Sequence, residues 1–310
     1  MPSNPTPPSP LTQSLLTSCT LCPRLCRVDR TAGRTGRCHA SADLTVARAA
    51  LHMWEEPCIT GEGGSGTVFF SGCGLGCIYC QNQAISGGRA GKIISTERLG
   101  EIFLELQQKG AENINLVTPT HYTPKVIEAV ACAKAQGLSI PIVCNLGGYE
   151  RPETLRLYEG IVDVWLPDFK YMSEQAGRDY SGAPDYAVWA KLSLAEMVRQ
   201  QPAPVFDGRG IMRRGVIVRH LLLPGGLADS KKVVEYLYRT YGDTIYISIM
   251  NQYTPVKHFE HFPELNRRVT EKEYEKLVDY AISLGVENGF IQEGGTASES
   301  FIPEFDNEGV

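Results

Sequence analysis

Short runs of apolar residues alternate along the chain with segments in which apolar residues recur every three or four positions. The recurring pattern predicts a helix over residues 96–109. Further helices are predicted at 123–137, 152–159, within 184–200, at 229–241, and after a capping box of Thr270 and Glu273. The apolar runs predict strands at 67–72, 114–119, 140–145, 162–168, 215–225, 244–250 and 289–292.

This alternation predicts an α/β fold, because strands that alternate with helices pair in parallel through right-handed crossovers. The strands are continuous apolar runs, as expected when both faces of a sheet are covered. About six strand–helix units follow one another, so the residues leave two architectures open: an open doubly wound sheet or a partial barrel.

The chain divides into four segments by composition. Residues 1–18 form a tail rich in proline, serine and threonine that is expected to be disordered. Residues 19–60 are rich in cysteine and arginine, and the glycine-rich stretch that starts at 61 opens the α/β domain, residues 61–300. Residues 301–310 are expected to form a C-terminal tail.

Composition narrows the class of protein. The chain has 310 residues, a net charge of −5 and 10 cysteines. No apolar stretch is long enough to cross a membrane, and the negative charge makes nucleic acid an unlikely main partner. The first ten residues do not resemble a secretory signal, so a cytoplasmic location with reduced thiols is expected. Closely spaced cysteines in that setting point to metal binding.

Polar side chains stand where several predicted strands end. Parallel strands bring their carboxyl ends to one face, where α/β proteins build their sites. We therefore expect a site there. Its candidate residues are Thr118, Thr120, His121, Asn145, Asp168, Lys170, Arg219 and His220. Of these, His220 is expected to be structural.

A three-cysteine loop follows the first predicted strand. Cys73, Cys77 and Cys80 have the spacing Cys-x3-Cys-x2-Cys, and three thiolates in eight residues can hold one face of a 4Fe–4S cluster. Such a cluster normally takes four cysteines, so one iron is left open to another ligand. Glycines within the loop let the backbone bend around the sulfurs.

This loop resembles that of the radical S-adenosylmethionine (SAM) superfamily. Further strings resemble a subgroup related to pyruvate formate-lyase activating enzymes: Thr118-Pro119-Thr120-His121, Pro167-Asp168-Phe169-Lys170, Arg219-His220 and Met250-Asn251-Gln252-Tyr253. The resemblance implies a partial (βα)6 barrel with a small Cys-rich N-terminal segment. It also implies that the open iron chelates SAM, that an electron breaks the C–S bond, and that the resulting 5′-deoxyadenosyl radical abstracts hydrogen from a substrate.

The resemblance implies roles for individual residues. Cys73, Cys77 and Cys80 would bind the cluster, Tyr79 would lie beside the adenine of SAM, and Asn145 would face a ribose hydroxyl. A reduced flavodoxin or ferredoxin would donate the electron.

The groups that meet the amino-acid end of SAM are less direct to assign. Activating enzymes have a Gly-Gly-Glu stretch after the second strand for the SAM amino group. This chain has Thr118, Thr120 and His121 there and no carboxylate. We therefore expect hydroxyls, carbonyls or His121 to meet the amino group.

The SAM carboxylate has two candidate partners. Asp168 and Lys170 resemble an Asp-x-Lys element of activating enzymes, so Lys170 would pair with the carboxylate. Arg219 would either do the same or form a salt bridge at the edge of the core.

The N-terminal segment carries a second cysteine group, Cys19, Cys22, Cys26 and Cys38. Four thiolates complete a shell for structural zinc or for an auxiliary iron–sulfur cluster. A set of unmetallated cysteines is the remaining alternative. Of the other cysteines, Cys132 is expected to be buried within its helix, and Cys58 and Cys144 either pack or face the substrate.

These observations favour a radical SAM enzyme whose substrate the sequence does not name. Placing a glycyl radical on a partner protein is the leading possibility, and modification of a peptide or small molecule is the alternative. A non-enzymatic iron–sulfur or zinc protein, such as a redox sensor or scaffold, is the rival from another class.

Overall fold

The computed structural model describes residues 10–292 and 303–310. Its strands are β1 (Thr45–His52), β2 (Ser65–Phe70), β3 (Lys92–Ile93), β4 (Ile114–Val117), β5 (Ile142–Leu146), β6 (Val164–Pro167), β7 (Val205–Phe206), β8 (Met212–Leu221), β9 (Tyr246–Met250) and β10 (Gly289–Ile291). Its α-helices are α1 (Pro10–Thr17), α2 (Pro57–Thr60), α3 (Gln83–Ser86), α4 (Thr96–Gln108), α5 (Thr123–Ala135), α6 (Pro152–Arg156), α7 (Glu174–Ser181), α8 (Tyr186–Gln200), α9 (Leu227–Tyr241) and α10 (Glu271–Leu284).

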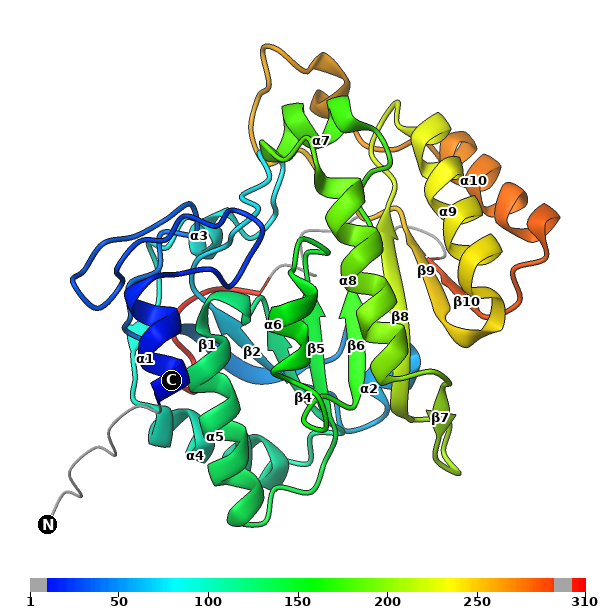
Figure 1. Cartoon of the computed structure of the whole chain (residues 1–310). Helices are drawn as coiled ribbons and strands as arrows, with labels where there is room; N and C mark the ends of the chain where they lie inside the picture. The colour runs from blue at the N-terminus through cyan, green and yellow to red at the C-terminus, as the bar shows by residue number, and fades with distance from the viewer. Residues whose placement is uncertain (1–9, 293–302) are drawn as a thin grey trace, which may run out of the picture.

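The strands form one sheet in the order β10-β9-β8-β6-β5-β4-β2-β1-β3, with β7 paired to β8 (Figure 1). Neighbours from β2 to β10 are parallel. Their order follows the chain without a reversal, whereas a doubly wound sheet reverses at a switch point. The partial barrel is therefore confirmed.

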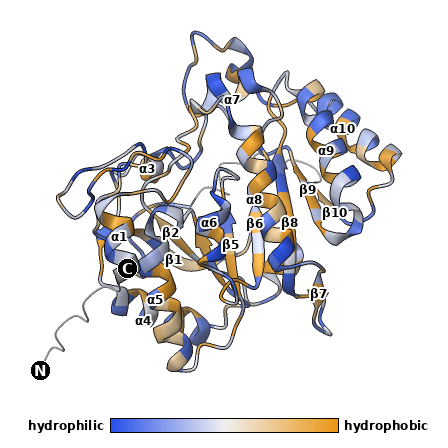
Figure 2. Cartoon of the chain, in the orientation of Figure 1, coloured by the Kyte–Doolittle hydropathy of each residue, from blue (hydrophilic) through white to orange (hydrophobic). Residues whose placement is uncertain are grey.

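The core lies between the sheet and the helices that cover it. Strands β2, β4 and β6 are buried along their whole length, as continuous apolar runs predict. Helix α4 packs on α5, and α9 packs on α10. Figure 2 shows apolar stretches along the strands and mixed apolar and polar sides on the covering helices.

Local signals in the sequence explain several helix boundaries. The predicted capping box at the start of α10 is present, because the Thr270 side chain and Glu273 exchange hydrogen bonds with each other's backbone. The helix ends at Gly285, whose φ of 94° is left-handed and favours glycine. Cys132 was wrongly expected to be buried. It is exposed on α5, because Ala129 and Ala133 face the core instead.

The N-terminal tail differs from its prediction within the described residues. Residues 10–17 form α1, which packs on α5, whereas disorder was expected through residue 18. Leu16 is buried, and the Thr12 hydroxyl donates a hydrogen bond of 2.7 Å to Glu128. Residues 1–18 are polar on average, although residues 15 and 16 are leucines. Composition alone therefore did not predict the packing of α1 on α5. Residues 1–9 lie outside the described ranges.

The cysteine-rich segment contributes a strand that the sequence pattern did not predict. Strand β1 pairs antiparallel with β2, so the sheet begins ahead of residue 61. Its sequence, TVARAALH, has alanines in place of strong strand formers and does not alternate strictly between apolar and polar.

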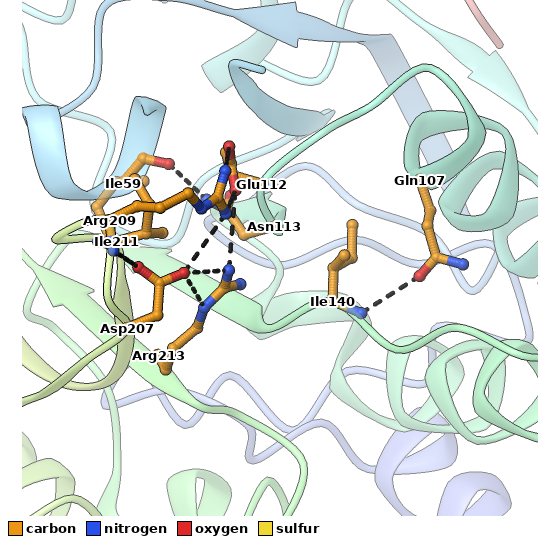
Figure 3. Close-up of polar contacts among 9 residues, drawn as sticks. All are labelled: Ile59, Gln107, Glu112, Asn113, Ile140, Asp207, Arg209, Ile211 and Arg213. Carbon is orange, nitrogen blue, oxygen red and sulfur yellow. Dashed lines mark hydrogen bonds and ion pairs between the residues drawn. The ribbon is translucent and has the colours of Figure 1, made fainter. Parts of the chain in front are cut away.

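The end of the barrel at which the parallel strands begin is closed by a charged network (Figure 3). Before β4, Glu112 accepts hydrogen bonds of 2.9 and 2.7 Å from Arg209. Asp207 bonds Arg213 at 2.6 Å, and the Asn113 amide donates to the Ile59 carbonyl at 2.7 Å. The network ties the β7–β8 connection and α2 across this end. The carboxyl ends of the strands remain for the site.

Candidate functional site

A cavity of about 370 Å³ lies at the carboxyl ends of the parallel strands. It is lined by the loops after β2, β4, β5 and β6, by the ends of β8 and β9, and by the cysteine-rich segment. All the candidate residues of the two cysteine groups line it: Cys19, Cys22, Cys26, Cys38, Cys73, Cys77 and Cys80. Tyr79, Thr118, Thr120, His121, Asn145, Asp168, Lys170 and Arg219 line it too. The structure thus brings the predicted site residues to one cavity, except His220, which is expected to be structural and does not line it.

The three-cysteine loop leaves β2 through a sharp bend. Gly72 and Gly76 have left-handed φ angles of 98° and 63°, and a Cβ on Gly72 would come within 2.6 Å of the Cys38 carbonyl oxygen. The Cys77 sulfur accepts a hydrogen bond of 3.0 Å from Ser181. Burial, followed by the charges of the neighbouring thiols, raises the pKa of Cys80 to about 12. The metal-free Cys80 thiol is therefore protonated at neutral pH.

Tyr79 is held within a cluster of aromatic rings. Its hydroxyl accepts a hydrogen bond of 2.6 Å from Tyr171, and its ring meets those of Tyr180 and Tyr253 edge-on, with centroids 6.2 Å apart. Burial raises its pKa well above the usual value, so the phenol stays neutral. The ring is a fixed apolar wall of the cavity.

The four-cysteine segment packs directly on the three-cysteine loop. The Cys22 sulfur lies 3.4 Å from the position that a Cβ on Gly74 would take. Arg24 donates hydrogen bonds of 3.0 and 3.3 Å to the carbonyls of Gly74 and Leu75. Burial, with smaller contributions from the three other thiols of the group, raises the pKa of Cys22 to about 12. The four cysteines therefore lie close to one another and to the loop.

The loop after β4 contains Thr118, Thr120 and His121. These residues occupy the place of the Gly-Gly-Glu stretch of activating enzymes. Thr118 has a left-handed φ of 58°, and its N–H donates to the Asn145 carbonyl at 2.9 Å. The His121 ring bonds the Ser71 carbonyl at 2.8 Å. Burial, then the charge of Arg30, lowers the pKa of His121 to about 3. His121 is therefore neutral, and its ring nitrogen Nε2 is already engaged.

Asp168 and Lys170 form an ion pair of 2.5 Å at the exit of β6. Burial alone would lower the pKa of Lys170, but the charge of Asp168 outweighs it and raises the pKa well above the usual value. Lys170 is therefore a permanent cation in the cavity wall.

Arg219 lies at the floor of the cavity and pairs with two carboxylates. It donates hydrogen bonds of 2.8 and 2.6 Å to Glu56 and also binds Glu55. Of the two roles that the sequence left open, the salt bridge is the one present in the structure. A contact of Arg219 with the SAM carboxylate stays a prediction.

Several residues at the site were not predicted. Glu55 and Glu56 line the cavity, as does Glu150, which follows Gly-Gly-Tyr after β5. Glu150 could have been predicted from the sequence, because it directly follows Gly147-Gly148-Tyr149 in the polar loop after the predicted strand at 140–145. Cys144 is fully buried, and Cys58 lines a second hollow beside Tyr246 instead. His220 bonds the Phe169 carbonyl at 2.7 Å and has a structural contact, as expected.

Within residues 10–292 and 303–310, no group of three or more His, Cys, Asp or Glu side chains is arranged to hold a single metal ion. In a 4Fe–4S cluster each cysteine binds its own iron, so three sulfurs need not converge on one point. The three-cysteine loop, bent around a shared cavity, fits that requirement. None of the helices in the described ranges is long and apolar enough to cross a membrane.

Comparison with known proteins decides the family. The sequence model of the Radical SAM superfamily matches residues 67–225, which run from β2 to the loop after β8. The chain belongs to the radical SAM superfamily. Membership implies SAM and a 4Fe–4S cluster, and the three cysteines that would hold the cluster lie within the matched residues.

Individual proteins that resemble this radical SAM chain share only a low sequence identity with it. It is 26% identical over 279 residues to the uncharacterized protein MJ0674 of Methanocaldococcus jannaschii, covering 87% of this chain and 76% of that protein. SuiB of Streptococcus suis, solved with its precursor peptide SuiA, has a TM-score of 0.48 at 12% identity. That match covers 72% of this chain and 47% of SuiB, so the chain spans less than half of SuiB.

A domain of pyruvate-formate lyase-activating enzyme from Bacteroides vulgatus has a TM-score of 0.39 at 15% identity. The match covers 56% of this chain and 92% of that domain. These likenesses do not identify the substrate of this radical SAM protein.

Proposed function

We propose that this chain is a radical SAM enzyme that cleaves SAM reductively in the cavity and abstracts hydrogen from a substrate. The observation that carries the proposal is the three-cysteine loop, which opens into a cavity lined by the polar strand ends. A 4Fe–4S cluster, once bound there, supplies the electron that breaks the C–S bond of SAM.

The chain's own residues bind and enclose the reactants. Cys73, Cys77 and Cys80 hold the cluster, and Lys170 offers a cation to the SAM carboxylate. Tyr79 and the cysteine-rich segment wall off the cavity from bulk water, which protects a reactive radical from side reactions.

The N-terminal cysteines and the electron source complete the proposal. Cys19, Cys22, Cys26 and Cys38 would hold an auxiliary iron–sulfur cluster, or zinc if their four sulfurs, which are not arranged around one ion in the described residues, draw together when the metal binds. A reduced flavodoxin or ferredoxin of the cytoplasm delivers the electron. The leading substrate is a glycine of a partner protein, which becomes a glycyl radical, and the string resemblances to activating enzymes support this choice.

The test is SAM cleavage by protein prepared and kept without oxygen. With a strong reductant, wild-type protein should release 5′-deoxyadenosine and methionine, and Cys77→Ser should release none. Cys132→Ser is the matched control, because Cys132 is exposed on α5 and does not line the cavity. Full cleavage by Cys77→Ser, or zinc without iron after attempted cluster loading, would overturn the proposal in favour of a non-enzymatic metal protein.

The substrate is tested separately by isotope transfer. An extract of the source cells grown on deuterated glycine is mixed with the enzyme, SAM and reductant. Deuterium in 5′-deoxyadenosine that depends on a protein fraction supports glycyl-radical formation. Deuterium-free product with active SAM cleavage would instead point to another residue, a peptide or a small molecule.

A further inference from the structure

In the described part of the chain, the carboxylates that line the cavity are Glu55, Glu56, Glu150 and Asp168. Arg219 pairs with the first two of these, and Lys170 pairs with Asp168. Glu150 has no cationic partner within 4.0 Å among the described residues, and its oxygen Oε2 accepts no hydrogen bond from any of them. It is the cavity carboxylate that the described residues leave available.

Glu150 is fixed in place by the loops around it. It lies between β5 and α6 and is 5% exposed. Its other oxygen, Oε1, accepts a hydrogen bond of 3.4 Å from the Thr120 hydroxyl, which follows β4. A Cβ on Gly148, two residues earlier, would come within 2.1 Å of the Asp168 carbonyl oxygen, so this backbone is tightly packed. The loop that carries Glu150 is therefore packed closely against the exit of β6, and its carboxyl group is buried.

A buried acceptor without a donor is unfavourable and calls for a ligand. Leaving such a group unpaired destabilises the folded protein. Burial, only partly offset by the Thr120 hydrogen bond, raises the pKa of Glu150 to about 8. The acid is thus held protonated at neutral pH until a hydrogen-bond donor enters the cavity and favours its ionised form.

The neighbours of Glu150 specify the shape of that ligand. The Lys170 cation lies close enough to Glu150 to act on its charge. An acceptor and a cation side by side complement an amino acid, whose amino group donates hydrogen bonds and whose carboxylate is an anion. The other candidate for the amino group, His121, already bonds the Ser71 carbonyl.

We propose that Glu150 binds the α-amino group of SAM. The inference rests on the proposed function, because it takes SAM as the occupant of the cavity. It supplies from the loop after β5 the carboxylate that the loop after β4 lacks. Glu150 is then a cofactor-binding residue, and Thr120 positions its carboxyl group.

The test is a cycle of binding measurements that combines a change in the protein with a change in the ligand. Calorimetry on cluster-loaded protein measures the Kd of SAM and of an analogue that carries hydrogen in place of the amino group. Glu150→Gln should weaken SAM binding by about 10- to 100-fold, the range of a hydrogen bond to a charged group, and weaken the analogue by less than about threefold. Glu153→Gln, an exposed carboxylate in the first turn of α6, is the matched control and should change neither.

The outcomes separate this inference from the proposed function. Equal weakening of both ligands, or no weakening of SAM, would overturn the role of Glu150 while SAM binding by wild-type protein upholds the function. No binding of SAM by cluster-loaded wild-type protein would overturn both. Glu150→Asp and the thermal unfolding midpoint check folding: a folded Glu150→Asp with wild-type affinity for SAM would show that the reach of the carboxylate does not matter, against the proposal.

Discussion

At the scale of single residues, the most highly charged part of the cavity wall is a buried arginine, Arg219, that pairs with two carboxylates. Arg219 lies in β8, whereas Glu55 and Glu56 lie between β1 and α2, more than 160 residues away in sequence. Burial would raise the pKa of Glu56, but Arg219 outweighs it and lowers the pKa. The three side chains are a charged unit that exists only when the N-terminal strand is docked.

Replacing Arg219 by methionine should lower the free energy of unfolding by about 3–5 kcal/mol, because it leaves two buried carboxylates without a cation. Urea denaturation measures the loss. Arg239→Met is the control: Arg239 is exposed and pairs with Glu235 on the surface of α9, so about 1 kcal/mol or less is expected. A loss for Arg219→Met no larger than that of the control would show that the pair adds little stability.

Glu150 should make the stability of the protein fall as pH rises. Its pKa is raised from 4.5 to about 8 on folding, so the folded state holds a proton that the unfolded state releases. This stability is fully present below pH 4.5 and is lost as pH rises toward 8. Relative to Glu150→Gln, wild-type protein should lose up to about 4–5 kcal/mol across that range, measured by urea unfolding without SAM. If the free energies of unfolding of wild-type protein and Glu150→Gln changed in parallel with pH, this prediction would be wrong.

Sequence reasoning identified residues at the site where local position was enough. Cys73 and Lys170 were found because each follows a strand whose carboxyl end must face the site. Arg219 was found as a residue, but its partners were not, since nothing local links β8 to residues 55 and 56. Glu150 was missed although it lies in the loop after β5, because only burial shows that its carboxyl group lacks a donor.

At the scale of elements, the buried side chain of Arg30 joins the cysteine-rich segment to the barrel. Arg30 is 1% exposed and donates hydrogen bonds to the carbonyls of Ala40 and Ser41 within the segment and of His121 on the barrel. Its guanidinium also lies 5.4 Å from the centre of the Tyr122 ring. The sequence cannot reveal this link, because every residue has a backbone carbonyl and the residue types therefore do not show which carbonyls Arg30 bonds.

Replacing Arg30 by methionine should loosen the segment from the barrel. Trypsin cleavage after Arg24 and Arg27 should become at least about tenfold faster, since about 1.4 kcal/mol of lost docking raises the open population by that factor. Peptide mapping by mass spectrometry measures the rate. Arg34→Met removes an exposed arginine of the same segment and should leave the rate unchanged. Unchanged cleavage in Arg30→Met would mean that other contacts hold the segment.

The whole molecule is a partial barrel with one closed end and one functional end. The Glu112–Arg209 and Asp207–Arg213 pairs close the end where the strands begin, and both cysteine groups meet at the other. The alternation of strands and helices predicted the α/β class. The choice between barrel and doubly wound sheet needed the order of strands, which is set by long-range pairing and not by periodicity.

The two cysteine groups should load metal independently although they touch. Cys22→Ser should lose the metal of the N-terminal group, about one zinc or about four irons per chain, while the cluster on the three-cysteine loop remains. Metal and sulfide analysis of anaerobically prepared protein measures the loss. A metal content equal to that of wild-type protein would show that the N-terminal cysteines hold no metal.

The last residues of the chain shield a strand from other molecules. The Ala49 N–H donates to the Glu308 carbonyl at 2.8 Å, and the Asn307 N–H donates to the Ala47 carbonyl at 3.1 Å. β3 covers β1 only at Thr45 and Val46. Deleting residues 303–310 would therefore bare a β-edge next to the exposed Met53, which is the kind of surface that recruits strands from neighbouring chains. Such a truncated protein should aggregate at concentrations where the full chain stays dispersed.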